Sequence, residues 1–192
     1  KPNTSRKAVG IDVGLNHFLA DSDNRFVENP RFFQKTADKI AALQRTLAKK
    51  KKGSNRREKI KLRLNNAYEH LQNQRKDFAH KLSTEYVKNY GMIAVEGLNI
   101  QGMAKNHRLS KSIYDAAWNM FISFLSYKAE SAGRILVKAD PRDTTQTCSV
   151  CGKKNTEHLD LSQRTFKCPY CGTELDRDYN ASRNILIKAL SG

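Results

Sequence analysis

The chain has 192 residues, and 39% of them are hydrophobic, which is enough for one medium domain or one domain carrying small insertions. Lys and Arg number 35 against 19 Asp and Glu, so the formal net charge is +16. This excess indicates a polyanionic partner, and we expect nucleic acid; a basic surface that serves only solubility is the alternative. No apolar run approaches the roughly 18 residues of a membrane-spanning helix, and no signal peptide opens the chain, so no membrane association is expected.

The first ninety residues divide into short strands and a helical segment. Residues 7–13, 17–21 and 25–28 read as a three-strand meander, with Asp12 inside the first strand. Residues 36–90 then show apolar side chains three, four or seven apart, in two stretches separated by four lysines and Gly53-Ser54. This pattern predicts a helical hairpin with a basic outer face. The lysines either form a solvated turn or contact nucleic acid.

The second half is expected to continue as strand, helix, strand and final helix. Residues 92–97 and 134–138 read as strands, residues 110–131 as an amphipathic helix between them, and residues 180–190 as the last helix. A polar loop is expected around His107. Without the hairpin and the cysteine-rich loop, the order is β-β-β-β-α-β-α. It is close to the ribonuclease-H-like α/β order, a mixed sheet whose first three strands are antiparallel and whose later strands are parallel.

All four cysteines lie in two CxxC pairs, and each pair is followed by a glycine. This usage fits a reducing cytosol and a metal site better than a disulfide framework. The spacing between the pairs falls in the window of structural zinc sites, in which two tight knuckles complete a tetrahedron of thiolates. A redox dithiol is the alternative. His158 lies between the pairs and is expected at the surface, since the predicted Zn²⁺ ligands are complete without it: Cys148, Cys151, Cys168 and Cys171.

Four carboxylates occupy positions where a catalytic set could form. Asp12 lies in the first strand, Glu96 ends the fourth, and Asp176 and Asp178 precede the last helix. If the first and fourth strands are neighbours, Asp12 and Glu96 can converge at one edge of the sheet. Carboxylates in apolar surroundings are costly unless they are paired or bind a cation, and their hard oxygens suit Mg²⁺ or Mn²⁺. The alternative is that Asp12 caps a turn and Glu96 pairs with a lysine.

Several motifs together resemble the TnpB family of transposon-encoded, RNA-guided DNA nucleases, relatives of the type V CRISPR effectors. They are Gly10-Ile-Asp-Val-Gly-Leu15, Val95-Glu-Gly-Leu-Asn-Ile100, Asp140-Pro-Arg-Asp-Thr-Thr-Gln-Thr-Cys-Ser-Val-Cys-Gly152 and Asp176-Arg-Asp-Tyr-Asn-Ala-Ser-Arg-Asn-Ile185. Asn73 to Leu82 and Asn29 to Phe33 are also similar to the family. The resemblance implies a split RuvC nuclease domain with a helical-hairpin insertion and an inserted zinc ribbon. It selects Asp12, Glu96 and Asp178 as catalytic Mg²⁺ ligands, with Asp176 in a supporting place.

The resemblance also implies the division of the chain and its partners. Residues 1–35, 91–146 and 173–192 would be the three parts of the RuvC domain, residues 36–90 the basic hairpin, and residues 147–172 the zinc ribbon. The partners would be DNA and a guide RNA, in a prokaryotic cytoplasm at the nucleoid. We expect phosphate contacts from basic side chains of the hairpin and near the zinc ribbon. They are Lys49, Lys50, Lys51, Lys52, Arg56, Arg57, Arg142 and Arg177.

The chain begins at Lys1 and reaches a strand almost at once, so we expect a processed product or part of a longer polypeptide. Family members carry recognition and wedge domains before the first RuvC motif, and the sequence resembles their C-terminal nuclease half. Those domains, or a full-length copy, are therefore expected partners. A second hypothesis is a non-enzymatic guide-RNA- or DNA-binding module that associates with a full-length nuclease. A third, a guide-independent resolvase or transposase of the same fold, does not explain the zinc ribbon. Metal-dependent cleavage of single-stranded DNA separates the first hypothesis from the second.

Overall fold

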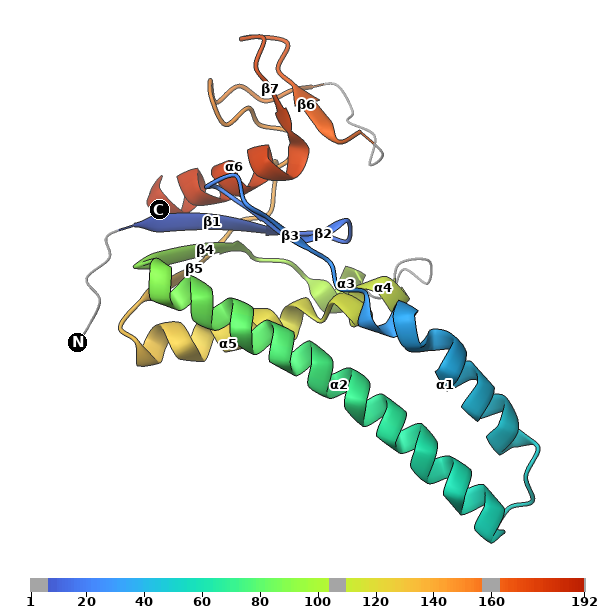
Figure 1. Ribbon diagram of the computed structural model, residues 1–192. Coiled ribbons are helices and arrows are strands. Elements are labelled where there is room, and N and C mark those ends of the chain that lie inside the picture. The colour runs from blue at the N-terminus through green and yellow to red at the C-terminus, as the bar shows by residue number, and fades with distance from the viewer. Residues whose placement is uncertain (1–6, 104–109, 157–162, 192) are drawn as a thin grey trace.

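The computed structural model describes residues 7–103, 110–156 and 163–191 (Figure 1). His158 and the polar loop around His107 lie outside these residues. The strands are β1 (Ala8–Val13), β2 (His17–Asp21), β3 (Phe26–Glu28), β4 (Met92–Glu96), β5 (Ile135–Ala139), β6 (Thr165–Lys167) and β7 (Glu174–Asp176). The helices are α1 (Phe32–Ala48), α2 (Asn55–Asn89), α3 (Ile100–Met103), α4 (Ser110–Ala116), α5 (Trp118–Ser131) and α6 (Arg177–Ser191).

The central sheet has five strands in the order β3-β2-β1-β4-β5. β1, β2 and β3 form the predicted antiparallel meander, and β4 and β5 then run parallel to β1. The predicted mixed sheet is therefore confirmed. β1 and β4 are direct neighbours, with Ile11 opposite Val95, so Asp12 and Glu96 each follow a residue of this pair at the same edge of the sheet.

Helices cover both faces of the sheet (Figure 1). On one face, apolar side chains of β1, β2 and β4 pack against α2 and α5 in the main core, which includes Ile11, Tyr86 and Phe121. α6 lies on the other face and approaches β1 very closely at Gly10. A Cβ at this position would stand 2.1 Å from the Ser182 carbonyl oxygen. Only glycine therefore allows this helix to pack against the strand.

α1 and α2 form the predicted hairpin, which begins at Phe32, four residues earlier than expected. The half of α2 near the turn packs on α1 around a small core of Ile40, Leu64 and Leu71, and its other half belongs to the main core. The hairpin projects away from the sheet, and the turn between its helices lies at the far tip (Figure 1). The lysine-rich turn therefore lies far from the sheet edge that carries Asp12.

The single helix predicted over residues 110–131 is wrong, because the chain breaks at Ala117. This residue has φ of 55° and ψ of 39°, in the left-handed region, and separates α4 from α5. Trp118, the first residue after the break, lies in the main core and is 2% exposed. In the described ranges, no helix is both long and apolar enough to span a membrane.

A small antiparallel ribbon, β6 and β7, lies beyond α6 on the side of the sheet opposite α2 (Figure 1). An isolated bridge between Thr147 and Lys154 precedes it, and buried Phe166 forms a small core with Cys148 and Cys168. β7 ends at Asp176 and α6 begins at the next residue. The cysteine-rich segment therefore connects directly to the helix that carries Asp178.

Candidate functional site

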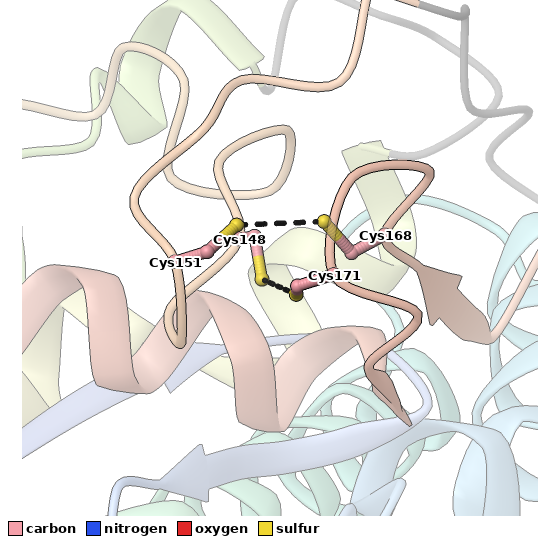
Figure 2. Close-up of side chains that lie close together, drawn as sticks. All are labelled: Cys148, Cys151, Cys168 and Cys171. Atoms are coloured by element: carbon pink, nitrogen blue, oxygen red, sulfur yellow. Dashed lines mark hydrogen bonds between the residues drawn. The ribbon is translucent and has the colours of Figure 1, made fainter.

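The four cysteines come together in one cluster, although 16 residues separate the two pairs in the sequence (Figure 2). All four sulfur atoms lie within 4.8 Å of one another. Cys148 Sγ stands 3.7 Å from Cys171 Sγ, and Cys151 Sγ stands 3.6 Å from Cys168 Sγ. A tetrahedron of thiolates around Zn²⁺, with Zn–S bonds of about 2.3 Å, has edges of about 3.8 Å. The cysteine cluster, as we call these four residues, has the dimensions of a structural zinc site.

The two knuckles of the cysteine cluster have the same backbone design. In each, the glycine after the second cysteine donates its N–H to the carbonyl of the first, at 2.9 Å for Gly152 and 3.0 Å for Gly172. Both glycines have positive φ, 73° and 72°, a conformation that side chains with a Cβ disfavour. The Thr173 hydroxyl and amide lower the pKa of Cys171 to about 6, which favours the thiolate that binds metal.

Asp12, Glu96 and Asp178 come from three elements that meet at one edge of the sheet, and we call them the acidic cluster. Asp12 is near the end of β1, Glu96 ends β4, and Asp178 lies in the first turn of α6. A Cβ added at Gly14, just after β1, would be 3.9 Å from Asp178 Oδ2. Within the described ranges, the four cysteines are the only group of three or more His, Cys, Asp or Glu side chains whose ligand atoms all lie within 4.8 Å of one another. The carboxylates of the acidic cluster are therefore more widely spaced than the cysteine sulfurs.

Burial disfavours ionisation of all three carboxylates in the acidic cluster, and neighbouring carboxylates add to this effect at Asp12 and Asp178. The pKa of Asp12 is raised well above its usual value by burial, then by the charges of Glu96 and Asp178. Burial also raises the pKa of Glu96, against a hydrogen bond from Thr144 and the charge of Lys188, which lower it. The pKa of Asp178 is raised by burial and by Asp176. A bound cation would relieve this electrostatic cost.

Asp176 has a different task from Asp178, although only one residue separates them. Its Oδ1 accepts hydrogen bonds from the backbone N–H groups of Asp178, at 2.9 Å, and Tyr179, at 3.1 Å. These are the contacts of a helix N-cap, so Asp176 fixes the start of α6 and thereby the position of Asp178. Among the described residues, Glu96 is not hydrogen-bonded to a lysine, as the alternative for this residue required: its hydrogen bond comes from Thr144, and the charge of Lys188 only lowers its pKa.

Sequence reasoning missed three polar residues that connect the two clusters. Thr144 Oγ1 donates to Glu96 Oε1 at 2.8 Å. On α6, Asn184 Nδ2 donates to the Thr144 carbonyl at 2.8 Å, and Asn180 Oδ1 accepts from the N–H of Ser149, in the first knuckle, at 2.9 Å. All three residues fall within the motifs that resemble TnpB proteins. Their polar side chains a few positions from the candidate ligands were the signal that the sequence offered.

The predicted nucleic-acid-binding residues do not form one patch. Residues 49–52 and Arg56 are at the hairpin tip, while Arg57 Nη1 donates to the Leu47 carbonyl at 2.6 Å and so caps the end of α1. Arg142 is exposed and pairs with Asp140 at 2.9 Å. Arg177 lies close enough to the acidic cluster to lower the pKa of Asp12. The sequence reading did not single out Arg164, an exposed residue that lowers the pKa of Asp178.

Two protein-family models match the chain. The OrfB_IS605 model, described as "Probable transposase", matches residues 1–107, and the Cas12f1-like TNB domain model matches residues 118–185. The structure is also similar to two cryo-EM structures. One is a Cas12f1–sgRNA–target DNA complex, with a TM-score of 0.65 and 21% identity over 93% of this chain and 49% of that one. The other is a CRISPR–Cas12f ternary complex, with a TM-score of 0.68 and 24% identity over 97% and 40%. At these identities the likeness shows a shared fold.

Curated relatives match almost the whole chain. A protein of Streptomyces pristinaespiralis named as a candidate RNA-guided DNA endonuclease is 35% identical over 185 residues, 96% of this chain and 46% of its own length. InsQ of Escherichia coli K12, named in the same way, is 34% identical over 197 residues, 95% of this chain and 49% of its own length. The chain thus spans about half the length of these relatives. The family models and the relatives agree, and the chain belongs to the TnpB family.

Proposed function

We propose that this chain is a RuvC-type nuclease region that cuts DNA in a transposon-associated, RNA-guided system. The main observation is the acidic cluster, in which three carboxylates from β1, β4 and α6 share one sheet edge and burial raises the pKa of each. The mixed sheet supports the ribonuclease-H-like assignment. The names of the relatives support an RNA-guided endonuclease that acts on DNA. We place this activity at the nucleoid of a prokaryotic cell.

The acidic cluster fits divalent metal because its donors are hard oxygens whose charges repel one another. Asp12, Glu96 and Asp178 would hold Mg²⁺ or Mn²⁺ between them. When bound there, two such ions supply Lewis-acid chemistry that activates a water and stabilises the departing 3′ oxygen of a phosphodiester. Asp176 orients Asp178 by capping α6. Arg177 and Arg164, whose charges lower the pKa values of Asp12 and Asp178, would contact the phosphates of a bound strand.

The cysteine cluster would bind a structural Zn²⁺ and play no direct part in the reaction. Its four sulfurs, which lie within 4.8 Å of one another, would complete a tetrahedron around the ion and leave no ligand position for a substrate. The module around it, which we propose as a zinc ribbon inserted before the last RuvC part, attaches to α6 through Asn180. Exposed lysines at the hairpin tip would contact phosphates far from the acidic cluster. In this proposal base pairing with a guide RNA supplies sequence selection.

Substituting Asp12 tests the proposal. Purified wild-type protein with Mg²⁺ should cut labelled single-stranded DNA, and Asp12→Ala should lower the rate by about 1000-fold or more, because a metal ligand is worth several kcal/mol in the transition state. Asp38→Ala, at an exposed aspartate of α1, is the matched control and should cut like the wild type. Binding to the same DNA, measured by fluorescence anisotropy, should hardly change in either variant. An Asp12→Ala protein that cuts at the wild-type rate would show that the acidic cluster is not catalytic.

The guided part of the proposal has a separate test. Nucleic acid that remains bound through a low-salt purification should be sequenced, because protein–phosphate contacts weaken steeply with salt. We expect one defined, structured RNA. Random fragments would instead indicate a general nucleic-acid binder, whether or not the protein cuts DNA.

A further inference from the structure

Thr144 is a buried polar residue placed between the two clusters. It follows β5 and precedes the first knuckle, and it is 2% exposed. Its hydroxyl has two acceptors within reach, Glu96 Oε1 at 2.8 Å and the Pro141 carbonyl at 3.2 Å. A hydroxyl has one proton to donate, and the shorter contact goes to the carboxylate. Thr144 thus contacts a candidate metal ligand that is 48 residues away in the sequence.

Thr144 is in turn held by the last helix. Asn184 is 4% exposed, and its Nδ2 donates to the carbonyls of Thr144, at 2.8 Å, and Thr147, at 2.6 Å. One turn earlier, buried Asn180 donates to the Thr147 carbonyl at 2.8 Å. The first turn of the same helix carries Asp178. α6 therefore positions one carboxylate directly and braces the segment that contacts another.

Glu96 needs such a brace more than Asp12 does. Asp12 has a short side chain inside a paired strand, and residues 11 and 13 on either side of it pair with β2. Glu96 is the last residue of β4, and its longer side chain has an extra torsion to fix. The Gly97 N–H bonds the Ala139 carbonyl at 2.9 Å, which fixes the backbone at this point but leaves the carboxylate free to rotate. The Thr144 hydroxyl supplies the contact that restricts it.

We propose that Thr144 is a positioning residue that orients the Glu96 carboxylate for divalent-metal binding, and that Asn184 holds Thr144 in place for this task. The inference rests on the proposed nuclease function. Hydrogen bonds to ligating carboxylates raise metal affinity because they fix the orientation of the ligand before the ion arrives. The competing explanation is that Thr144 only ends the turn after β5 through its contact with Pro141, and that its contact with Glu96 has no effect on metal.

Thr144→Val separates these explanations, because it keeps the shape of the side chain and removes the hydroxyl. In zinc-loaded protein, Mn²⁺ binding measured by calorimetry should weaken about 10- to 100-fold. The Mg²⁺ concentration for half-maximal DNA cleavage should rise in parallel, with a smaller change in rate at saturating Mg²⁺. Thr144→Ser keeps the hydroxyl and should restore both values to within about twofold of the wild type. Thr46→Val, which removes a hydroxyl that bonds only within α1, should change neither value.

Asn184→Ala provides a second reading if Thr144→Val does not fold, as judged by circular dichroism melting. It keeps the hydroxyl but frees its backbone, so Mn²⁺ binding should weaken in the same direction and by less. The inference is overturned if folded Thr144→Val binds Mn²⁺ with the affinity of the wild type. If only Asn184→Ala folds, the same result in that variant overturns it. If Asp12→Ala abolishes Mn²⁺ binding in the same series, the proposed function stands even where the inference about Thr144 fails. Mn²⁺ binding that survives Asp12→Ala overturns both.

Discussion

The cysteine cluster and the acidic cluster are both proposed metal sites, but the chain builds them in opposite ways. Each half of the cysteine cluster is made by five consecutive residues, with the same Gly-to-Cys backbone hydrogen bond in both knuckles. The acidic cluster has one residue from each of β1, β4 and α6, and no two of them are closer than 82 residues in sequence. Local backbone geometry therefore shapes each half of the first, whereas the pairing of β1 with β4 and the packing of α6 on the sheet determine the second. This difference predicts that they can be damaged separately.

The largest effect is expected from removing a sulfur ligand. Cys151→Ser should lower bound zinc from about one equivalent to near zero, measured by mass spectrometry of the metal. Structural Zn²⁺ in small cysteine sites contributes about 10 kcal/mol or more of apparent binding free energy, so the module should lose several kcal/mol of stability. Val150→Ser changes an exposed residue of the same knuckle, 56% exposed, and should keep both zinc and stability. Full zinc binding by Cys151→Ser would rule out a four-sulfur site.

A smaller effect, which spares the cysteine cluster, is expected from Gly10→Ala. The added methyl would stand 2.1 Å from the Ser182 carbonyl oxygen and 2.8 Å from the Leu186 nitrogen, so α6 must move away from β1. Overpacking of this kind costs about 1–3 kcal/mol or somewhat more. Thermal unfolding should show this loss, and Mn²⁺ binding should weaken because Asp178 moves with α6, while the zinc content stays unchanged.

Gly14→Ala is the matched control for the stability measurement, because the atom nearest to its added methyl, the His17 carbonyl oxygen, would be 3.2 Å away and needs to shift only slightly. Its methyl would also stand 3.9 Å from Asp178 Oδ2, so this control is followed by thermal unfolding and zinc content. If Gly10→Ala lost both its zinc and its affinity for Mn²⁺, the two clusters would not be independent of each other.

The smallest expected effect is a gain in stability. Asp12→Asn removes the carboxylate whose pKa is raised by burial, by Glu96 and by Asp178, so without divalent metal it should stabilise the protein at pH 7 by about 1 kcal/mol. A raised pKa in the folded state means that the folded protein binds more protons than the unfolded chain does. The free energy of unfolding contributed by the acidic cluster should therefore fall as pH rises from about 4, the pKa of unfolded Asp and Glu, through the raised folded values.

Chemical denaturation across this pH range, in chelator and in Mg²⁺, measures the effect. Asp12→Asn should show a shallower fall than the wild type in chelator, and Mg²⁺ should stabilise the wild type more than the variant. Asp38→Asn, at an exposed position on α1, should follow the wild type throughout. A wild-type protein whose stability falls no more steeply than that of Asp12→Asn in chelator would contradict the raised pKa of Asp12.

The predictions from sequence succeeded where the signal was local. Strand ranges in the meander, the two helices of the hairpin and the pairing of cysteines into one cluster all follow from residue spacing, and the structure confirms them. The break at Ala117 was not predictable, because alanine favours helix, yet Ala117 adopts the left-handed conformation between two buried residues, Ile113 and Trp118. Tertiary packing overrides the local preference there.

The sequence by itself determined which residues could bind metal: two CxxC knuckles with glycines that permit positive φ, and carboxylates at the ends of apolar strands. Only the tertiary structure decided which residues meet. Pairing of β1 with β4 puts Asp12 beside Glu96, and the close approach at Gly10 lets α6 bring Asp178 to the same edge. The same helix places Thr144 against Glu96 through Asn184. Contacts between residues so distant in the chain depend on packing, which no local pattern encodes.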